Sequence, residues 1–173
     1  MSNFKEKLAA VKAFVFDIDG VLSMQTISLN SFSLPNRTVN LRDGYALQLA
    51  VKKGYYVAVI SGSRSKDYVK RLNGLGIKDI YINSRKKSEH FKTFLEKHHL
   101  ESKDVLYMGD DIPDYEVMKI AGIPVCPSDA DSEIKQISLY ISDRKGGEGC
   151  VRDVIEQVMR LHNKWMDTDA FTW

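Results

Sequence analysis

Four short runs of β-forming apolar residues alternate with helical patterns along this sequence, and this alternation limits the possible folds most strongly. The runs cover residues 11–16, 55–60, 80–82 and 105–108. Continuous apolar runs of this length are typical of parallel strands that are buried on both faces. Because helical patterns separate the runs, the order along the chain indicates βαβ units. We therefore predict an α/β fold with a mainly parallel central sheet.

The second half of the chain continues this pattern, whereas one early segment interrupts it. Further strands are predicted at 123–126 and 139–141, and an amphipathic helix at about 149–165 ends the pattern. Residues 26–41 contain stretches with a period of two, which predict a protruding β-hairpin directly after the first strand. Since no repeat or flexible linker divides the sequence, we expect a single domain over 1–173.

Charge and cysteine content exclude several classes of protein. The 25 basic and 23 acidic residues nearly cancel, which argues against a protein that grips a nucleic-acid backbone but leaves small anionic ligands possible. Cys126 and Cys150 lack ligand spacing, so neither a disulfide framework nor a zinc site is indicated. No signal peptide or membrane span is recognised, and we expect a cytoplasmic protein without a membrane partner.

Polar residues gather in the loops that follow the four predicted strands, and such loops meet at one edge of a parallel sheet. They are Asp17, Asp19 and Gly20 after the first strand, Ser61 and Gly62 after the second, Lys86 and Lys87 beyond the third, and Asp110, Asp111 and Asp114 after the fourth. Crowded carboxylates repel one another unless a cation lies among them. Oxygen ligands without His or Cys favour Mg²⁺, which typically acts beside phosphate oxygens.

Parts of this set also have purely structural interpretations. Asp17 to Gly20 resembles an ordinary turn after a strand, and Asp111 or Ile112 can cap the helix predicted behind Pro113. Capping needs only one acid, however, and the sequence supplies three. Four correctly ordered elements on four successive strand ends therefore favour a catalytic site.

The ordered motifs resemble those of the haloacid dehalogenase superfamily of phosphohydrolases. They are Asp17-Ile18-Asp19-Gly20-Val21-Leu22, Ser61-Gly62, Lys87 and Gly109-Asp110-Asp111-Ile112-Pro113-Asp114. The resemblance covers nearly the whole chain. It implies a Rossmann-like three-layer sandwich and a phosphatase. Because no insertion is large enough, it also implies that the separate cap domain common in this superfamily is missing.

The resemblance also implies a role for each motif. Asp17 would attack phosphorus and form an aspartyl-phosphate, and Asp19 would act as general acid and then general base. Ser61 and Lys87 would neutralise the transferring phosphoryl group. Spacing in the superfamily selects Lys87 over its neighbour Lys86. The implied ligands of Mg²⁺ are Asp17, the main-chain carbonyl of Asp19, Asp110 and, through water, Asp111.

Two further motifs narrow the implied substrate to the phosphate of a 2-keto-3-deoxy sugar acid. They are Asn40-Leu41-Arg42-Asp43-Gly44-Tyr45 and Gly146-Gly147-Glu148-Gly149. We expect an eight-carbon octulosonate 8-phosphate, with a nine-carbon, sialic-acid-type 9-phosphate as the alternative. Arg42 and Asp43 also have a simpler interpretation as charges at a helix N-terminus. The expected substrate-binding residues are Asp19, Asn40, Leu41, Arg42, Asp43, Gly44, Ser61, Gly62, Arg71 and Lys87.

The sequence departs from the superfamily pattern at two places. After Val21-Leu22 the superfamily usually continues with an acidic residue and glycine, whereas this sequence has Ser23-Met24-Gln25. The superfamily also has an arginine directly after the glycine of the second strand, where this sequence has Ser63 and then Arg64. Members without a cap form tetramers by resemblance, with the hairpin closing a neighbour's site, so we expect a homotetramer. A phospho-acceptor receiver domain and an inactive scaffold are the remaining alternatives.

Overall fold

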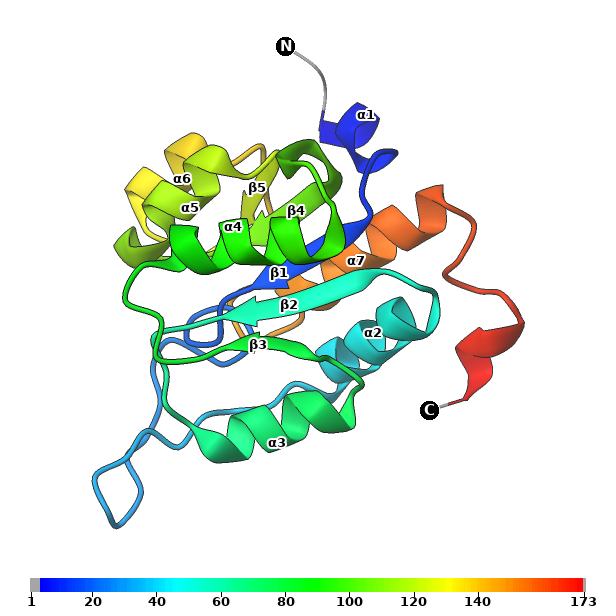
Figure 1. The fold of residues 1–173 in the computed structure, drawn as a ribbon. Helices are drawn as coiled ribbons and strands as arrows, with labels where there is room; N and C mark the ends of the chain where they lie inside the picture. The colour runs from blue at the N-terminus through cyan, green and yellow to red at the C-terminus, as the bar shows by residue number, and fades with distance from the viewer. Residues whose placement is uncertain (1–3, 173) are drawn as a thin grey trace.

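A computed structural model, which describes residues 4–172, contains a six-stranded, fully parallel sheet (Figure 1). The strand order is β3-β2-β1-β4-β5-β6, so β1 lies in the middle. This arrangement confirms the predicted parallel α/β sheet. The strands are β1 (Ala13–Phe16), β2 (Tyr56–Ile60), β3 (Asp79–Tyr81), β4 (Val105–Met108), β5 (Ile123–Cys126) and β6 (Tyr140–Ile141).

Helices cover both faces of the sheet and complete the three layers. The α-helices are α1 (Phe4–Leu8), α2 (Leu41–Lys52), α3 (Lys66–Gly74), α4 (Lys87–His98), α5 (Tyr115–Ile120), α6 (Ser132–Ile137) and α7 (Cys150–Leu161). Helices α2, α3 and α7 pack on one face, and α4, α5 and α6 on the other. None of the described helices is long and apolar enough to cross a membrane, and no segment within 4–172 folds as a separate cap.

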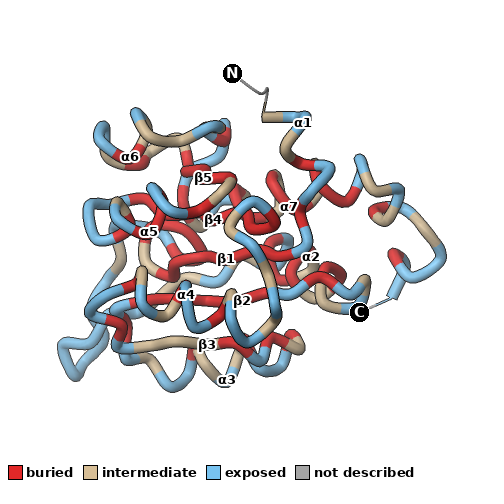
Figure 2. The backbone as a smooth tube through the Cα atoms, turned by 45° about the horizontal axis from the view of Figure 1, so that its top comes forward, coloured by how far each residue is buried: buried red, intermediate tan, exposed pale blue. Residues whose placement is uncertain are grey.

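Two hydrophobic cores result from the alternation of side chains along β1. Phe14 and Phe16 point into the core beneath α2, α3 and α7, whereas Ala13 and Val15 point into the core beneath α4, α5 and α6. All four side chains are fully buried, and the tube in Figure 2 is accordingly red along the central strands. Burial on both faces explains why these strands are continuous apolar runs in the sequence.

The segment between β1 and α2 protrudes as the predicted hairpin, but it does not form paired strands (Figure 1). One isolated antiparallel bridge joins Leu29 to Pro35, and the amide of Asn30 donates to the carbonyl of Leu34. A two-stranded ribbon is marginally stable by itself, and Pro35 lacks an amide hydrogen for a longer ladder. Leu41, the predicted end of the hairpin, instead begins α2.

The C-terminal end of the described chain folds back on α2. Helix α7 ends at Leu161, and the following segment buries Trp165 against Tyr45 in an edge-to-face contact with ring centroids 6.1 Å apart. The hydroxyl of Tyr45 also donates to the carbonyl of Ala170, and Lys53 pairs with Asp167. This tail therefore packs against its own subunit in the structure.

Candidate active site

Two acidic residues follow the central strands β1 and β4 and lie side by side. Phe16 pairs with Met108 in the parallel register, and the amide of Asp17 donates to the carbonyl of Met108 over 3.2 Å. Asp17 and Asp110 therefore reach the same edge of the sheet, where Asp114 joins them. Carboxylate oxygens of these three buried acids all lie within 4.8 Å of one another.

Gly20 makes room for this acid cluster. Its φ is +83°, and a Cβ atom there would lie 1.9 Å from Oδ2 of Asp110. Any other L-residue would thus be strained in its backbone and would displace the Asp110 carboxylate. The glycine of the Asp17-Ile18-Asp19-Gly20 motif is needed for the position of an acid that lies 90 residues further along the chain.

Lys87 supplies the positive charge that the acid cluster needs. It is the first residue of α4, its side chain is 5% exposed, and its Nζ lies 2.7 Å from Asp17 and 2.8 Å from Asp114. Burial lowers the pKa of Lys87, but the two carboxylates outweigh burial and the pKa is raised. Lys86 is exposed and pairs with Glu89, so the geometry selects Lys87 of the two lysines.

The acids retain more negative charge than one lysine balances. Burial, together with Asp114, raises the pKa of Asp17 to about 6 against the lowering effect of Lys87. Burial also raises the pKa of Asp110 to about 7. Oδ1 of Asp110 and Oδ2 of Asp114 are buried without a hydrogen-bond partner. Unpartnered carboxylate oxygens in an oxygen-only cluster fit a hard divalent cation, and Mg²⁺ is the cofactor of this kind of site.

Asp19 lies at the edge of the cluster and is held by a residue that the sequence did not reveal. Its carboxylate accepts two hydrogen bonds from Arg37, at 2.6 Å from Nε and 2.8 Å from Nη2. Arg37 comes from the protruding 24–39 loop. Neither spacing nor composition indicates this contact, because it depends on how the loop folds back toward Asp19.

All four predicted catalytic residues line a cavity of about 680 Å³. Ser61 is buried in its wall and accepts a hydrogen bond from the amide of Ser63. Asp111 lies at the rim, exposed, and caps the short helical turn Ile112–Asp114, as its structural interpretation predicted. That turn directs Asp114 into the cluster instead. The predicted residues in the cavity wall are Asp17, Asp19, Gly20, Ser61, Gly62, Lys87, Asp110, Asp111 and Asp114.

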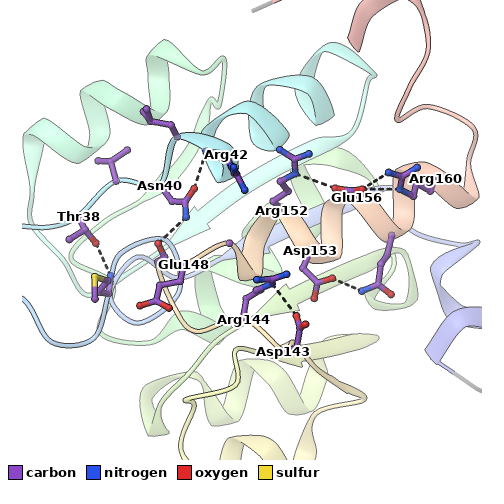
Figure 3. A pocket seen from close by; sticks show the side chains of 16 residues that line it. Thr38, Asn40, Arg42, Asp143, Arg144, Glu148, Arg152, Asp153, Glu156 and Arg160 are labelled. Carbon is purple, nitrogen blue, oxygen red and sulfur yellow. Dashed lines mark hydrogen bonds and ion pairs between the residues drawn. The ribbon is translucent and has the colours of Figure 1, made fainter. Parts of the chain in front are cut away.

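Three other predicted substrate-binding residues lie on a larger groove of about 1230 Å³ between the start of α2, residues 143–149 and α7 (Figure 3). Asn40, Leu41 and Arg42 line this groove. Oδ1 of Asn40 caps α2 by accepting the amides of Arg42 and Asp43. Since the groove contains none of the clustered acids, we assign the chemistry to the smaller cavity and not to the larger one.

Asp43, Gly44 and Arg71 form a buried contact between α2 and its neighbours. Asp43 accepts the amide of Arg152 at 2.7 Å at the start of α7. Burial raises the pKa of Asp43 to about 6, against the lowering effect of the amides of Arg152 and Gly149. Nη2 of Arg71 lies over Gly44, where a Cβ atom would come within 2.8 Å. Within one chain, these three residues do not line the acid cavity.

Comparisons with known proteins identify the family of this chain. A family model described as haloacid dehalogenase-like hydrolase matches residues 73–154. The 3-deoxy-D-manno-octulosonate 8-phosphate phosphatase of Escherichia coli K12 is 31% identical over 158 residues, covering 91% of this chain and 84% of that protein. The corresponding protein of Yersinia pestis is 30% identical over 159 residues, with 92% and 85% covered.

A solved structure extends the comparison to three dimensions. The crystal structure of the Moraxella catarrhalis 3-deoxy-D-manno-octulosonate 8-phosphate phosphatase, in complex with magnesium ion, phosphate ion and KDO, matches with a TM-score of 0.88. The two chains are 29% identical, and the match covers 92% of each. With its ordered motifs and its buried acid cluster, this chain belongs to the haloacid dehalogenase superfamily and is a phosphatase.

Proposed function

We propose that this phosphatase hydrolyses the phosphate ester of a 2-keto-3-deoxy sugar acid, with 3-deoxy-D-manno-octulosonate 8-phosphate as the preferred substrate. The observation that carries the proposal is the buried cluster of Asp17, Asp110 and Asp114 against Lys87. The names of the relatives support the choice of sugar. Family membership sets aside the receiver-domain alternative.

In the proposed mechanism, Asp17 is the nucleophile. One carboxylate oxygen of Asp17 contacts Lys87, and the other accepts the amide of Ile18, so the carboxylate is fixed in orientation. It attacks phosphorus, the bond from phosphorus to the sugar oxygen breaks, and the sugar hydroxyl leaves with a proton from Asp19. Asp19 then takes a proton from the water that hydrolyses the aspartyl-phosphate, which restores Asp17 and releases phosphate.

Asp17, Asp110 and the main-chain carbonyl of Asp19 would hold Mg²⁺, with Asp114 as the nearest further carboxylate. When bound, the ion supplies positive charge beside the phosphoryl oxygens, which is the main electrostatic requirement of phosphoryl transfer. Lys87 would balance the negative charge of the same phosphoryl group, and the Ser61 hydroxyl would donate a hydrogen bond to it. Arg37 holds the Asp19 carboxylate in two hydrogen bonds and so fixes its direction at the cavity rim.

We also propose that the active form is a homotetramer in which the 24–39 loop closes a neighbour's active site. Leu29, Phe32 and Leu34 are 63%, 82% and 58% exposed at the end of this loop. Exposed apolar side chains gathered in one segment are typical of protein contact surfaces. Assembly would also bring a second chain to an acid cavity that, in one chain, lacks the sugar-binding motif at Asn40 to Gly44.

Phosphate release from the two candidate sugar phosphates tests this function. The wild type should hydrolyse the octulosonate 8-phosphate faster than the nonulosonate 9-phosphate, and EDTA should abolish both activities. Asp17→Asn should lower kcat by at least roughly 10³-fold, because the nucleophile is lost. The exposed Asp67→Asn is the matched control and should remain active. Equal or reversed sugar preference would contradict the substrate, and an active Asp17→Asn would contradict the nucleophile.

A further inference from the structure

Gln25 reaches from the loop after β1 to the acid cluster. It belongs to the Ser23-Met24-Gln25 sequence that departs from the superfamily pattern, where an acidic residue and glycine are usual. Its side-chain amide Nε2 donates to Oδ2 of Asp110 over 3.0 Å and lies 3.2 Å from the carbonyl oxygen of Asp129. Gln25 also lines the 680 Å³ cavity.

The two oxygens of the Asp110 carboxylate therefore have different surroundings. Oδ2 lies over Gly20 and accepts the hydrogen bond from Gln25, whereas Oδ1 is buried and has no partner. A hydrogen bond to one oxygen restricts rotation of the carboxylate and leaves the other oxygen for a ligand. Partners of this kind orient metal-binding carboxylates in many proteins.

The chemistry of Gln25 suits this purpose better than that of other polar side chains. Lys or Arg at this place would bring a positive charge that competes with a bound cation, and Glu would add repulsion to three acids. A neutral amide donates a hydrogen bond without either effect. The same amide reaches Asp129, whose carboxylate accepts the amide of Gly146, so the contact connects three loops at the sheet edge.

We propose that Gln25 is a positioning residue for the divalent cation site, where it holds Asp110 with Oδ1 directed to the ion and thereby raises metal affinity. The proposal rests on the metal site of the proposed function. It assigns a role to a residue at which this chain departs from its superfamily. Substitution of such partners typically lowers metal affinity by about 10–100-fold.

Mn²⁺ binding to the full-length protein, followed by electron paramagnetic resonance with Mg²⁺ as competitor, tests the proposal without using activity. Gln25→Met keeps the length of the side chain but removes the donor, and it should raise the Kd for both ions by about 10-fold. Gln25→Gly, which removes the whole side chain, should do the same. Gln157→Met removes an equivalent amide from α7, which donates to Asp153 away from the acid cavity, and should leave both Kd values unchanged.

Kinetics and stability distinguish positioning from a merely structural tether. Gln25→Met should need about 10-fold more Mg²⁺ for half-maximal turnover yet reach a kcat within about twofold of the wild type. Its unfolding midpoint in EDTA should equal that of the wild type. Unchanged metal affinity, or a loss of stability in EDTA that accounts for the weaker binding, would overturn the proposal. A wild type that binds no Mn²⁺ would instead overturn the metal site of the proposed function.

Discussion

The acid cavity and the 24–39 loop both lie beyond the end of β1, but they differ in burial and in the number of contacts that hold their side chains. In the cavity, Asp17, Lys87 and Asp114 are nearly fully buried, and charged contacts of 2.7–2.8 Å connect them. In the loop, Phe32 is 82% exposed and a single bridge joins the two arms. Groups that carry out chemistry need fixed positions, which strand ends provide. In the proposed tetramer, the surface of a neighbouring chain would cover the apolar side chains of this loop.

Lys87→Met tests the buried side of this comparison and should have the largest effect. The substitution leaves Asp17 and Asp114 without their counter-ion, so kcat should fall by roughly 10²–10³-fold. The free energy of unfolding at pH 8 should fall by about 3–5 kcal/mol, because one partner of a buried ionic cluster is removed. Phosphate release and urea unfolding measure the two effects.

The adjacent Lys86→Met is the control, since Lys86 is exposed and pairs with the equally exposed Glu89. It should change neither kcat nor stability noticeably. Equal losses of kcat and of stability in the two variants would show that the buried contacts of Lys87 contribute no more than the exposed pair of Lys86.

Asp43→Asn extends the comparison to an acid that is buried outside the catalytic cavity. The pKa of Asp43 is about 6 in the fold against 3.8 ordinarily. Folding therefore favours its protonated form: this stabilisation is complete below about pH 4 and is lost as the pH rises to about 6. The asparagine side chain of the variant does not titrate. The free energy of unfolding of Asp43→Asn, minus that of the wild type, should therefore be about 3 kcal/mol higher at pH 8 than at pH 3.5.

Urea unfolding at both pH values measures this difference, with the exposed Asp67→Asn as the control that should show no pH-dependent gain. A constant difference between Asp43→Asn and the wild type from pH 3.5 to pH 8 would mean that the carboxylate is solvated in the fold. Water would then reach the contact between Asp43 and the start of α7.

Phe32→Ser tests the exposed side and should have the smallest effect on the single chain. Because the ring is 82% exposed, the free energy of unfolding of the monomer should change by less than about 0.5 kcal/mol. The tetramer should nevertheless dissociate at protein concentrations at least about 10-fold higher, since the ring would lose its contact with a neighbour. Light scattering over a dilution series measures the dissociation.

Phe171→Ser is the matched control, because Phe171 is 74% exposed but lies in the C-terminal tail. It should leave assembly unchanged. A wild-type chain that is monomeric and fully active would contradict the proposed tetramer directly.

Sequence reasoning worked where local pattern decides the structure. The strands were predictable because burial on both faces requires continuous apolar runs. Asp17 and Asp110 could be placed together because strand ends of a parallel sheet must meet, whereas only the resemblance to the superfamily separated Lys87 from Lys86. Sequence reasoning could not tell which of Asp111 and Asp114 turns inward. The short helical turn Ile112–Asp114 decides this by exposing Asp111 and burying Asp114.

Contacts made by the irregular loop were beyond reach for a different reason. Gln25 and Arg37 meet the acids only after the loop has folded back, and neither residue type is informative in a loop. The motif at Asn40 to Gly44 was recognised, but its position depends on the direction of α2. Within one chain, Asn40, Leu41 and Arg42 face the large groove, and Asp43 and Gly44 are buried in the interior.

The central position of β1 also affects how the chain must be made. Ala13 pairs with Tyr56 on one side and with Val105 on the other, so the second neighbour is synthesised about 90 residues after β1. At roughly 5–20 residues per second, a nascent chain carries an apolar strand with at least one open edge for roughly 5–20 s. During this interval the edge is available to other extended chains. The strand that precedes the proposed nucleophile, Asp17, is therefore also the strand that waits longest for its second partner during synthesis.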